Sequence, residues 1–167
     1  MTIRRIRLFG DPVLRTPAAP VTRFDDELRG LVTDLMDTML GEPGRAGVAA
    51  PQIGVSLRVF VYDADDQRGH LVNPVLTERS GMQDGDEGCL SLPGMGFATP
   101  RADVVTVTGT DRYGAPLTIT GTGFLARALQ HETDHLDGVL YVDTLRGDAR
   151  RQALRELRRV RPVRANP

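Results

Sequence analysis

The chain has 167 residues, of which 40% are hydrophobic and 26% are charged, and its formal net charge is −1. This composition can form a substantial core, which excludes wholesale disorder and a fibrous repeat. The length fits one domain, and the motifs described below are spread over most of it. We therefore expect a single domain over residues 1–167.

The sequence shows no export or membrane segment. Its start, MTIRRIRLFGDPVLR, lacks the apolar core of a signal peptide, and no stretch approaches the ~18 uninterrupted apolar residues of a membrane span. The only cysteine, Cys89, has no disulfide partner within the chain, which is typical of a reducing compartment. These observations predict a cytoplasmic protein.

Three segments have the pattern of helices. Apolar residues recur at three- and four-residue steps between Phe24 and Gly41, which predicts an N-terminal amphipathic helix. The same spacing runs from Thr122 to a helix-stopping glycine, Gly138. A last helix is predicted at about 148–160, with apolar residues on one side and arginines mostly on the other.

The middle of the chain has the pattern of strands. Two apolar runs, at 57–63 and 70–76, are separated by the polar segment ADDQRG. The segments 104–110 and 115–121 flank DRYG as a hairpin. The order of a helix, several antiparallel strands and then further helices predicts an α+β fold in which a helix packs against antiparallel sheet.

The strongest motif is HETDH at 131–135, an H-E-x-x-H pattern on the second predicted helix. His131 and His135 are one helical turn apart, so both imidazoles can reach one metal ion. Glu132 projects about 100° away from His131 and can reach a water bound to that metal. The alternative is a solvated helix with two surface histidines.

A catalytic site of this type needs a third protein ligand. Position 141, where one extension of the motif has a histidine, is Tyr141. The remaining histidine, His70, begins a predicted strand, where a surface or edge role is the better interpretation. Cys89 lies in DGDEGCLSLPG, and its thiolate suits zinc or ferrous iron, so it is the better candidate. A buried structural cysteine is the alternative.

Hydrolysis of an amide also requires donors for the oxygen that becomes negative. Gln52 follows a run of small residues and carries a side-chain amide N–H. The backbone N–H of Leu90, next to Cys89, is a second candidate. Spacing alone assigns neither.

Three segments together resemble the three signature motifs of the peptide deformylase family: GVAAPQIG at 47–54, EGCLSLPG at 87–94 and QHETDHLDG at 130–138. The similarity extends from GDPVLR near the start to YVDTL after the last motif. Members of this family remove the N-terminal formyl group from new bacterial proteins. The resemblance implies an α+β fold of antiparallel sheets around a central helix that carries the H-E-x-x-H motif.

The resemblance also implies roles for single residues. Cys89, His131 and His135 would bind the metal, which in the family is usually Fe2+, with Zn2+, Ni2+ or Co2+ as substitutes. Water activated there would attack the formyl carbon of a formyl-methionyl nascent peptide and release formate. Glu132 would act first as general base and then as general acid. Gln52 and the Leu90 N–H would donate hydrogen bonds to the oxyanion, and Gly47 would make a backbone contact to the substrate.

Two further features concern the rim and support of this site. The family's first motif commonly has glycine where this chain has Arg45, which affects the shape of the rim. Arg101 matches an arginine that the family keeps, and we expect it to pair with Glu87 and brace the Cys89 loop. Two unconnected surface charges are the alternative. Helix spacing further suggests Phe124 and Ala128 as part of an apolar methionine pocket.

Eight arginines fall between Arg146 and Arg164, against only Asp148 and Glu156. This arginine-rich helix and tail, at about 148–167, is either a solvated helix face or a surface for ribosomal RNA. Two rival functions stay open: a metallopeptidase that uses the same motif on internal peptide bonds, and a non-catalytic, ribosome-associated homologue.

Overall fold

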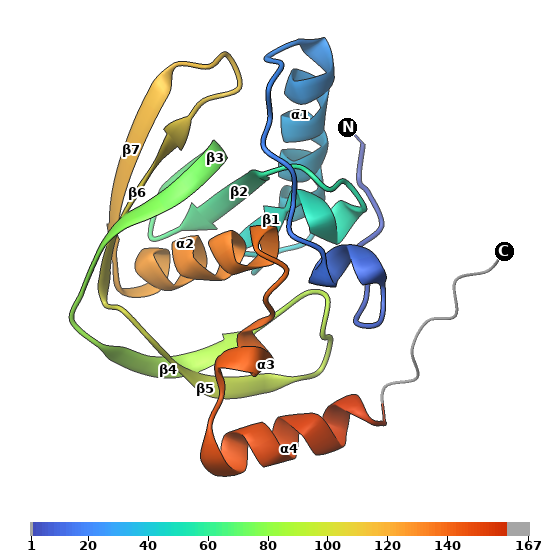
Figure 1. The fold of residues 1–167 in the computed structure, drawn as a ribbon, viewed down its shortest axis with the longest axis vertical. Helices are drawn as coiled ribbons and strands as arrows, with labels where there is room; N and C mark the ends of the chain where they lie inside the picture. The colour runs from blue at the N-terminus through green and yellow to red at the C-terminus, as the bar shows by residue number, and fades with distance from the viewer. Residues whose placement is uncertain (1, 160–167) are drawn as a thin grey trace, which may run out of the picture.

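The computed structural model describes residues 2–159, so the expected tail beyond Arg159 lies outside the described residues. Its larger sheet has five antiparallel strands in the order β1-β2-β3-β6-β7. These strands are β1 (Gly47–Ala49), β2 (Val59–Ala64), β3 (Gln67–Ser80), β6 (Val104–Thr110) and β7 (Pro116–Thr122). The predicted strands at 57–63, 70–76, 104–110 and 115–121 are confirmed as β2, β3, β6 and β7, and the antiparallel α+β fold is confirmed (Figure 1).

The first predicted helix is confirmed as α1, Asp26–Leu40. Its start is fixed by Asp25, whose carboxylate accepts a hydrogen bond from the backbone N–H of Leu28 at 3.2 Å. This bond satisfies one of the backbone donors that a helix N-terminus leaves unpaired. The acidic residues Asp26 and Glu27 in the first turn also suit the positive end of the helix dipole.

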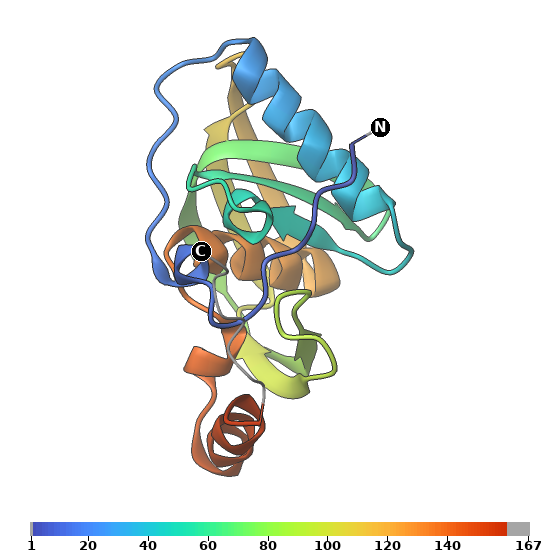
Figure 2. The same ribbon diagram turned by 90° about the vertical axis from the view of Figure 1, so that its right-hand side faces the viewer.

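Strand β2 separates two helices because its side chains alternate between the two faces of the sheet. Val59 and Val61 pack in the core cluster that contains α1 residues. Phe60 and Tyr62 point the other way and pack against the second helix, α2 (Gly123–Leu136). Figure 2 shows α1 on one face of the sheet and α2 on the other. All four side chains are buried, which is why β2 has an almost continuous apolar sequence.

Helix α2 is the predicted central helix, and Gly138 ends it as expected. Gly138 has φ 71°, and a Cβ atom there would lie 2.7 Å from the carbonyl oxygen of Arg15. The position therefore requires glycine both for its backbone conformation and for its contact with the N-terminal segment. Ala18 N–H donates to the Leu136 carbonyl at 2.8 Å, which fixes the end of α2 further.

A second, two-stranded sheet pairs β4 (Gln83–Gly88) with β5 (Gly96–Arg101). The sequence analysis did not predict these strands. Near them lie the short helix α3 (Tyr141–Thr144) and α4 (Gly147–Leu157), which pack on the β5 side through a cluster that includes Phe97 and Ala153. The last helix predicted at 148–160 corresponds to α4, although residue 160 lies outside the described part of the chain.

Two short 3-10 helices complete the structure, η1 (Pro12–Arg15) and η2 (Ala50–Ile53). The N-terminal segment runs past η2 and past the segment after β4, because Arg7 N–H donates to the Gln52 carbonyl at 2.7 Å and Phe9 N–H to the Ser91 carbonyl at 2.9 Å. Within residues 2–159, none of the helices has the length and apolar character that a membrane crossing requires.

Candidate metal centre and active-site pocket

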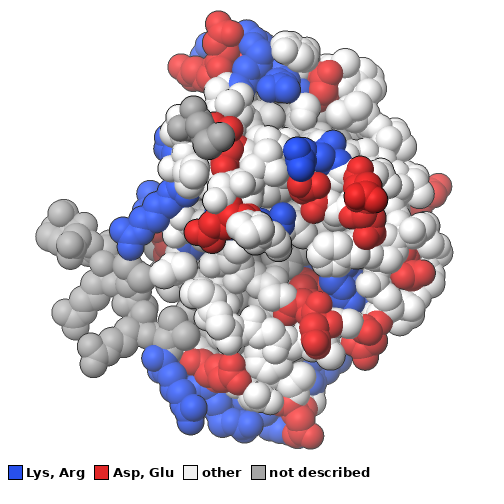
Figure 3. Space-filling view, turned by 180° about the vertical axis from the view of Figure 1, so that it is seen from behind, with Lys and Arg blue, Asp and Glu red and all other residues white. Residues whose placement is uncertain are grey.

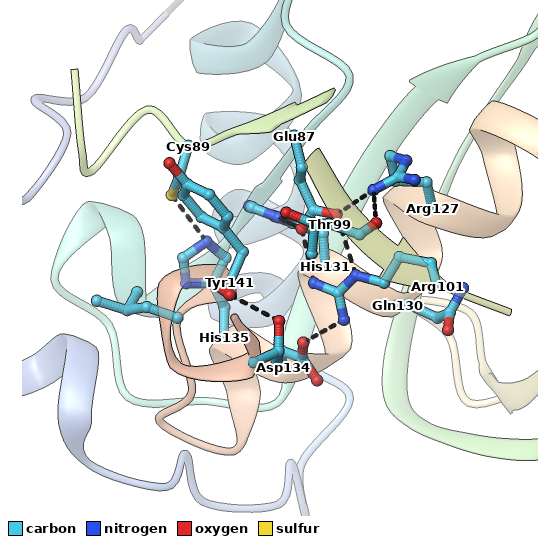
Figure 4. A network of polar contacts seen from close by, with 12 residues as sticks. Glu87, Cys89, Thr99, Arg101, Arg127, Gln130, His131, Asp134, His135 and Tyr141 are labelled. Atoms are coloured by element: carbon cyan, nitrogen blue, oxygen red, sulfur yellow. Dashed lines mark hydrogen bonds and ion pairs between the residues drawn. The ribbon is translucent and has the colours of Figure 1, made fainter. Parts of the chain in front are cut away.

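Cys89, His131 and His135 converge although they come from different elements. The two histidines lie one turn apart on α2, and Cys89 directly follows β4. The Cys89 Sγ lies 3.3 Å from His135 Nε2, and one ligand atom from each of the three residues falls within 4.8 Å of the others (Figure 4). Cys89 is partly buried and directly follows β4.

This arrangement fits a metal of the zinc or ferrous type. Metal–sulfur and metal–nitrogen bonds of about 2.3 Å and 2.0–2.1 Å in a tetrahedral site place neighbouring ligand atoms roughly 3.5 Å apart. The sulfur and nitrogen of Cys89 and His135 already have that separation. Three protein ligands also leave a position for water, as catalytic sites require.

The second nitrogen of His131 has a partner of its own. His131 Nδ1 lies 2.6 Å from Glu87 Oε1, and the same carboxylate accepts bonds from Arg101 Nε at 3.0 Å and Nη2 at 2.6 Å. Arg101 Nη1 also donates to Asp134 at 2.6 Å. The expected pairing of Glu87 with Arg101 is confirmed, and the alternative of two unconnected surface charges is wrong because both side chains are buried.

The neighbours of Glu87 keep it charged. Burial alone would raise the pKa of this carboxyl group, but the hydrogen bonds from His131 and Arg101 outweigh burial and lower the pKa to about 2. A charged Glu87 accepts the Nδ1–H of His131, which leaves Nε2 for the metal.

Arg127 is a residue that the sequence analysis missed. Its Nη1 donates to Glu87 Oε2 at 2.7 Å and to the Thr99 carbonyl at 2.8 Å, and the side chain is buried. Arg127 precedes His131 by four residues, so the two side chains lie on the same side of α2, and this spacing could have identified Arg127 from the sequence.

Glu132 fits against Gly47 of the first motif. A Cβ atom at position 47 would lie only 2.5 Å from Glu132 Oε1. Glu132 is buried, and its Oε2 has no hydrogen-bond partner among the described residues. Burial raises the pKa of Glu132 to about 7, against the lowering effects of His131 and His135. A carboxyl group with such a pKa can take and return a proton near neutral pH.

In the absence of metal the ligand residues favour charged forms. Burial would raise the pKa of the Cys89 thiol, but the nearby imidazoles of His135 and His131 hold it well below its usual value. Burial likewise opposes protonation of His131, yet the bonds to Cys89 and Glu87 raise its pKa well above its usual value. The site therefore stabilises a thiolate, which is the form that binds metals.

Gln52 is buried next to Cys89. Its Nε2 lies 3.7 Å from Cys89 Sγ and 3.3 Å from Ser91 Oγ, while its Oε1 accepts a bond from the Ala49 backbone N–H at 2.9 Å. The last bond fixes which end of the amide faces the site. Gln52 and Leu90 both line the pocket that also contains Cys89.

This pocket has a volume of about 560 Å3, and its wall includes Cys89, His131, Glu132, Gln52 and Gly47 but not His135 or Arg101. Phe124 and Ala128 lie in its wall, as helix spacing suggested. Arg45 lies at the rim, where its Nη1 donates to the Thr38 carbonyl at 2.5 Å and its Nη2 lies 2.7 Å from Glu42. The guanidinium of Arg45 is thus held by α1 and by the loop that follows α1.

His70 does not join the metal cluster. It lies in β3 and is half-buried, and its Nε2 accepts the backbone N–H of Arg112 at 3.0 Å. The surface or edge role expected for His70 is only partly met, because the residue lies within β3, between β2 and β6 in the sheet order, and is half-buried. Tyr141, which stands where a related motif has histidine, instead stacks its ring on that of His131 at 6.1 Å between centroids.

Comparisons with known proteins agree with this geometry. The family model described as polypeptide deformylase matches residues 3–151. A peptide deformylase of Acidothermus cellulolyticus is 58% identical over 158 residues, covering 95% of this chain and 87% of that protein. The crystal structure of a Legionella pneumophila peptide deformylase matches with a TM-score of 0.86 and 43% identity, covering 99% of both chains. That of Thermus thermophilus matches with a TM-score of 0.88 and 42% identity, covering 94% of each chain. The chain therefore belongs to the polypeptide deformylase family of metal-binding hydrolases.

Proposed function

We propose that this protein removes the formyl group from formyl-methionyl nascent polypeptides and releases formate. The observation that carries the proposal is one pocket that brings the Cys89 sulfur and His131 together with Glu132 and Gln52. A non-catalytic metal site needs neither a buried carboxylate nor an amide donor beside its ligands. The whole chain, residues 1–167, is proposed to act as a single catalytic domain in the cytoplasm, where nascent chains are made.

Cys89, His131 and His135 are the proposed metal ligands, and Fe2+ is the proposed ion, with Zn2+, Ni2+ or Co2+ able to substitute. A thiolate with two imidazoles suits these borderline cations better than Mg2+ or Ca2+, which prefer oxygen ligands. When bound, the metal supplies Lewis acidity that makes hydroxide available from water near neutral pH.

Glu132 is the proposed general base and then general acid. Its buried carboxylate takes a proton from the attacking water as the new bond to the formyl carbon forms. It then returns the proton to the amine nitrogen as the carbon–nitrogen bond breaks, so that formate and a free N-terminal methionine are the products. The unpartnered Oε2 supports this role, since an oxygen without a protein partner can accept the proton.

Gln52 Nε2 and the backbone N–H of Leu90 are the proposed donors to the oxyanion. The bond from Ala49 holds Gln52 with its amide nitrogen on the Cys89 side, so the donor is in place before substrate binds. Gly47 is the proposed backbone contact to the substrate chain. Phe124 and Ala128 supply apolar surface for the methionine side chain.

The test is to mix anaerobically purified protein with formyl-Met-Ala-Ser and to assay for formate, with acetyl-Met-Ala-Ser as the matched control. A formyl carbon carries only hydrogen, so a site closed around it should reject the acetyl group. The proposal predicts formate release and no acetate. Cleavage of internal bonds in blocked peptides would instead favour the metallopeptidase function, and absence of any hydrolysis would favour the non-catalytic homologue.

The ribosome is a proposed partner through α4. Arg150, Arg151 and Arg155 are exposed, and Figure 3 shows arginines gathered at the end of the molecule where α4 lies, with acidic groups beside them. Replacing these three arginines by glutamine should reduce co-sedimentation with ribosomes and its salt dependence. Substitution is preferable to deletion because Ala153 of α4 is part of the core. Unchanged co-sedimentation would leave α4 as a solvated face.

A further inference from the structure

Arg127 occupies an unusual position for a cation. Its side chain forms part of the pocket wall, next to Ala128 and His131, yet it is only 5% exposed. A buried guanidinium is unfavourable unless acceptors compensate for its lost hydration. Here a single nitrogen, Nη1, donates both to Glu87 Oε2 and to the Thr99 carbonyl.

The other terminal nitrogen of Arg127 is not satisfied. Nη2 is buried without a hydrogen-bond partner among residues 2–159, and it lies where a Cβ on Gly85 would be 3.4 Å away. A buried donor without a partner costs free energy, so its presence calls for a compensating role. That role is indicated by Glu87, the charged group with which Arg127 forms an ion pair.

Glu87 connects Arg127 with a metal ligand. Its Oε2 accepts from Arg127 and from Arg101 Nε, and its Oε1 accepts from Arg101 Nη2 and lies 2.6 Å from His131 Nδ1. The carboxylate is thus held on both oxygens, and rotation about its last bond would break several bonds at once. The direction in which His131 Nε2 points depends on this fixed carboxylate.

Arg127 also adds positive charge beside the two carboxylates of this cluster. Glu87 and Asp134 carry two negative charges, and Arg101, which bonds to both, carries one positive charge. Arg127 supplies a further positive charge through its bond to Glu87 Oε2. Without it, Glu87 would be shared between fewer donors in a buried environment and would be held less firmly against His131.

We propose that Arg127 is a positioning residue, which clamps Glu87 from the pocket side and thereby orients the imidazole of His131 for metal binding. The proposal rests on the proposed assignment of Cys89, His131 and His135 as metal ligands. Arg127 lines the pocket, and its guanidinium bonds to the carboxylate that contacts His131. A substitution that removes the guanidinium but keeps an apolar side chain in the pocket lining should therefore weaken metal binding and turnover more than it weakens substrate binding.

Arg127→Met tests this separation, because methionine keeps an unbranched apolar stem and loses the guanidinium. Metal-free protein is titrated with Co2+, and binding is followed by the thiolate-to-cobalt absorption band. Loss of such a supporting contact typically weakens metal affinity by about 10–100-fold, and we expect a loss in this range. With formyl-Met-Ala-Ser, kcat should fall while KM stays close to its wild-type value. Arg127→Lys, which keeps the charge on a shorter side chain, should have intermediate affinity.

The matched control is Arg58→Met. Arg58 is a partly buried arginine that also contacts α2, donating to the Leu136 carbonyl at 3.1 Å and to Asp137 at 2.8 Å, but it does not line the pocket. This variant should keep wild-type Co2+ affinity. A second readout is the proton resonance of His131 Nδ1–H in the zinc-loaded protein, which should shift in Arg127→Met and stay in place in Arg58→Met.

Wild-type affinity and an unshifted Nδ1–H resonance in Arg127→Met would overturn the proposal. Should that variant fail to fold, Arg127→Lys takes its place, and wild-type Co2+ affinity in the folded lysine variant would overturn the proposal equally. Absence of the thiolate band in the wild type would overturn the ligand assignment and this proposal together. A normal band without formate release would contradict only the proposed function.

Discussion

Gly47 and Glu132 lie so close together that a side chain at position 47 would overlap the carboxylate. The Cβ of such a side chain would lie 2.5 Å from Oε1 and 2.8 Å from Cγ of Glu132. The absence of a side chain at the start of β1 thus leaves space for Glu132 in the pocket. This contact links a residue of the first motif to a residue of the third.

Gly47→Ala should therefore displace Glu132. We expect turnover to fall by about 100-fold, because displacements of about 1 Å at a reacting group have effects of that size. Overpacking should also lower the free energy of unfolding by about 1–3 kcal/mol. Steady-state kinetics and denaturant unfolding measure the two effects. Gly30→Ala is the control, since nothing lies within 4 Å of a Cβ there, and unchanged kinetics in Gly47→Ala would refute the contact.

Glu132→Ala should separate metal binding from catalysis. Glu132 is not among the three clustered ligands, so the variant should retain its metal. Loss of a general acid–base group typically lowers the rate by about 10²–10⁴-fold, and we expect kcat to fall at least that far. Metal analysis and formate assays on the same sample give both values. Loss of metal from a folded Glu132→Ala protein would show that Glu132 is a ligand instead.

His70 should make stability depend on pH. Burial, together with the charge of Arg112, lowers the pKa of His70, and Asp111 opposes this only in part. Because the folded pKa lies below the unfolded value of about 6.5, the unfolded chain binds more protons as the pH falls. Stability from this group is complete above about pH 6.5 and declines as the pH falls below it.

His70→Gln removes this titration while keeping an acceptor for the Arg112 N–H. From pH 7 to pH 5 the unfolding free energy of the wild type should fall relative to that of this variant. NMR titration of the His70 ring gives the pKa directly. A His70 pKa above 6.5 in the folded protein would contradict the interpretation.

The proposed iron form should be sensitive to oxygen. A cysteine is more readily oxidised as its thiolate, and the nearby imidazoles lower the pKa of Cys89 beside the proposed redox-active ion. Iron-loaded protein should lose activity under air faster than nickel-loaded protein, and mass spectrometry should find added oxygen on Cys89. Equal lifetimes of the two forms would count against ferrous iron as the cause.

Sequence periodicity predicted the elements whose packing is regular. Helices α1 and α2 and strands β2, β3, β6 and β7 have clear apolar patterns, and Gly138 marked the end of α2. Strands β4 and β5 escaped prediction because QDGDEG and GFATPR contain glycine, proline and acidic residues. Their inward side chains include the buried charges Glu87 and Arg101, which pair with each other rather than with an apolar core.

The candidate site was predictable to the extent that its chemistry requires particular residue types at fixed spacing. His131, Glu132 and His135 follow from helix geometry, and Cys89 from the need for a third ligand. The support around them did not follow, because Arg127 reaches Glu87 only once β4 packs beside α2. The pairing of Gly47 with Glu132 likewise depends on a strand and a helix that meet only in the folded chain.

The metal content of Cys89→Ser tests the central claim most directly. The account holds that one sulfur and two imidazoles bind a single ion, so wild-type protein purified without oxygen should contain about one metal ion per chain. A serine hydroxyl is a much poorer ligand for these cations, so the folded variant should contain far less metal and release little formate from formyl-Met-Ala-Ser. A Cys89→Ser protein with full metal content and full activity would contradict the account.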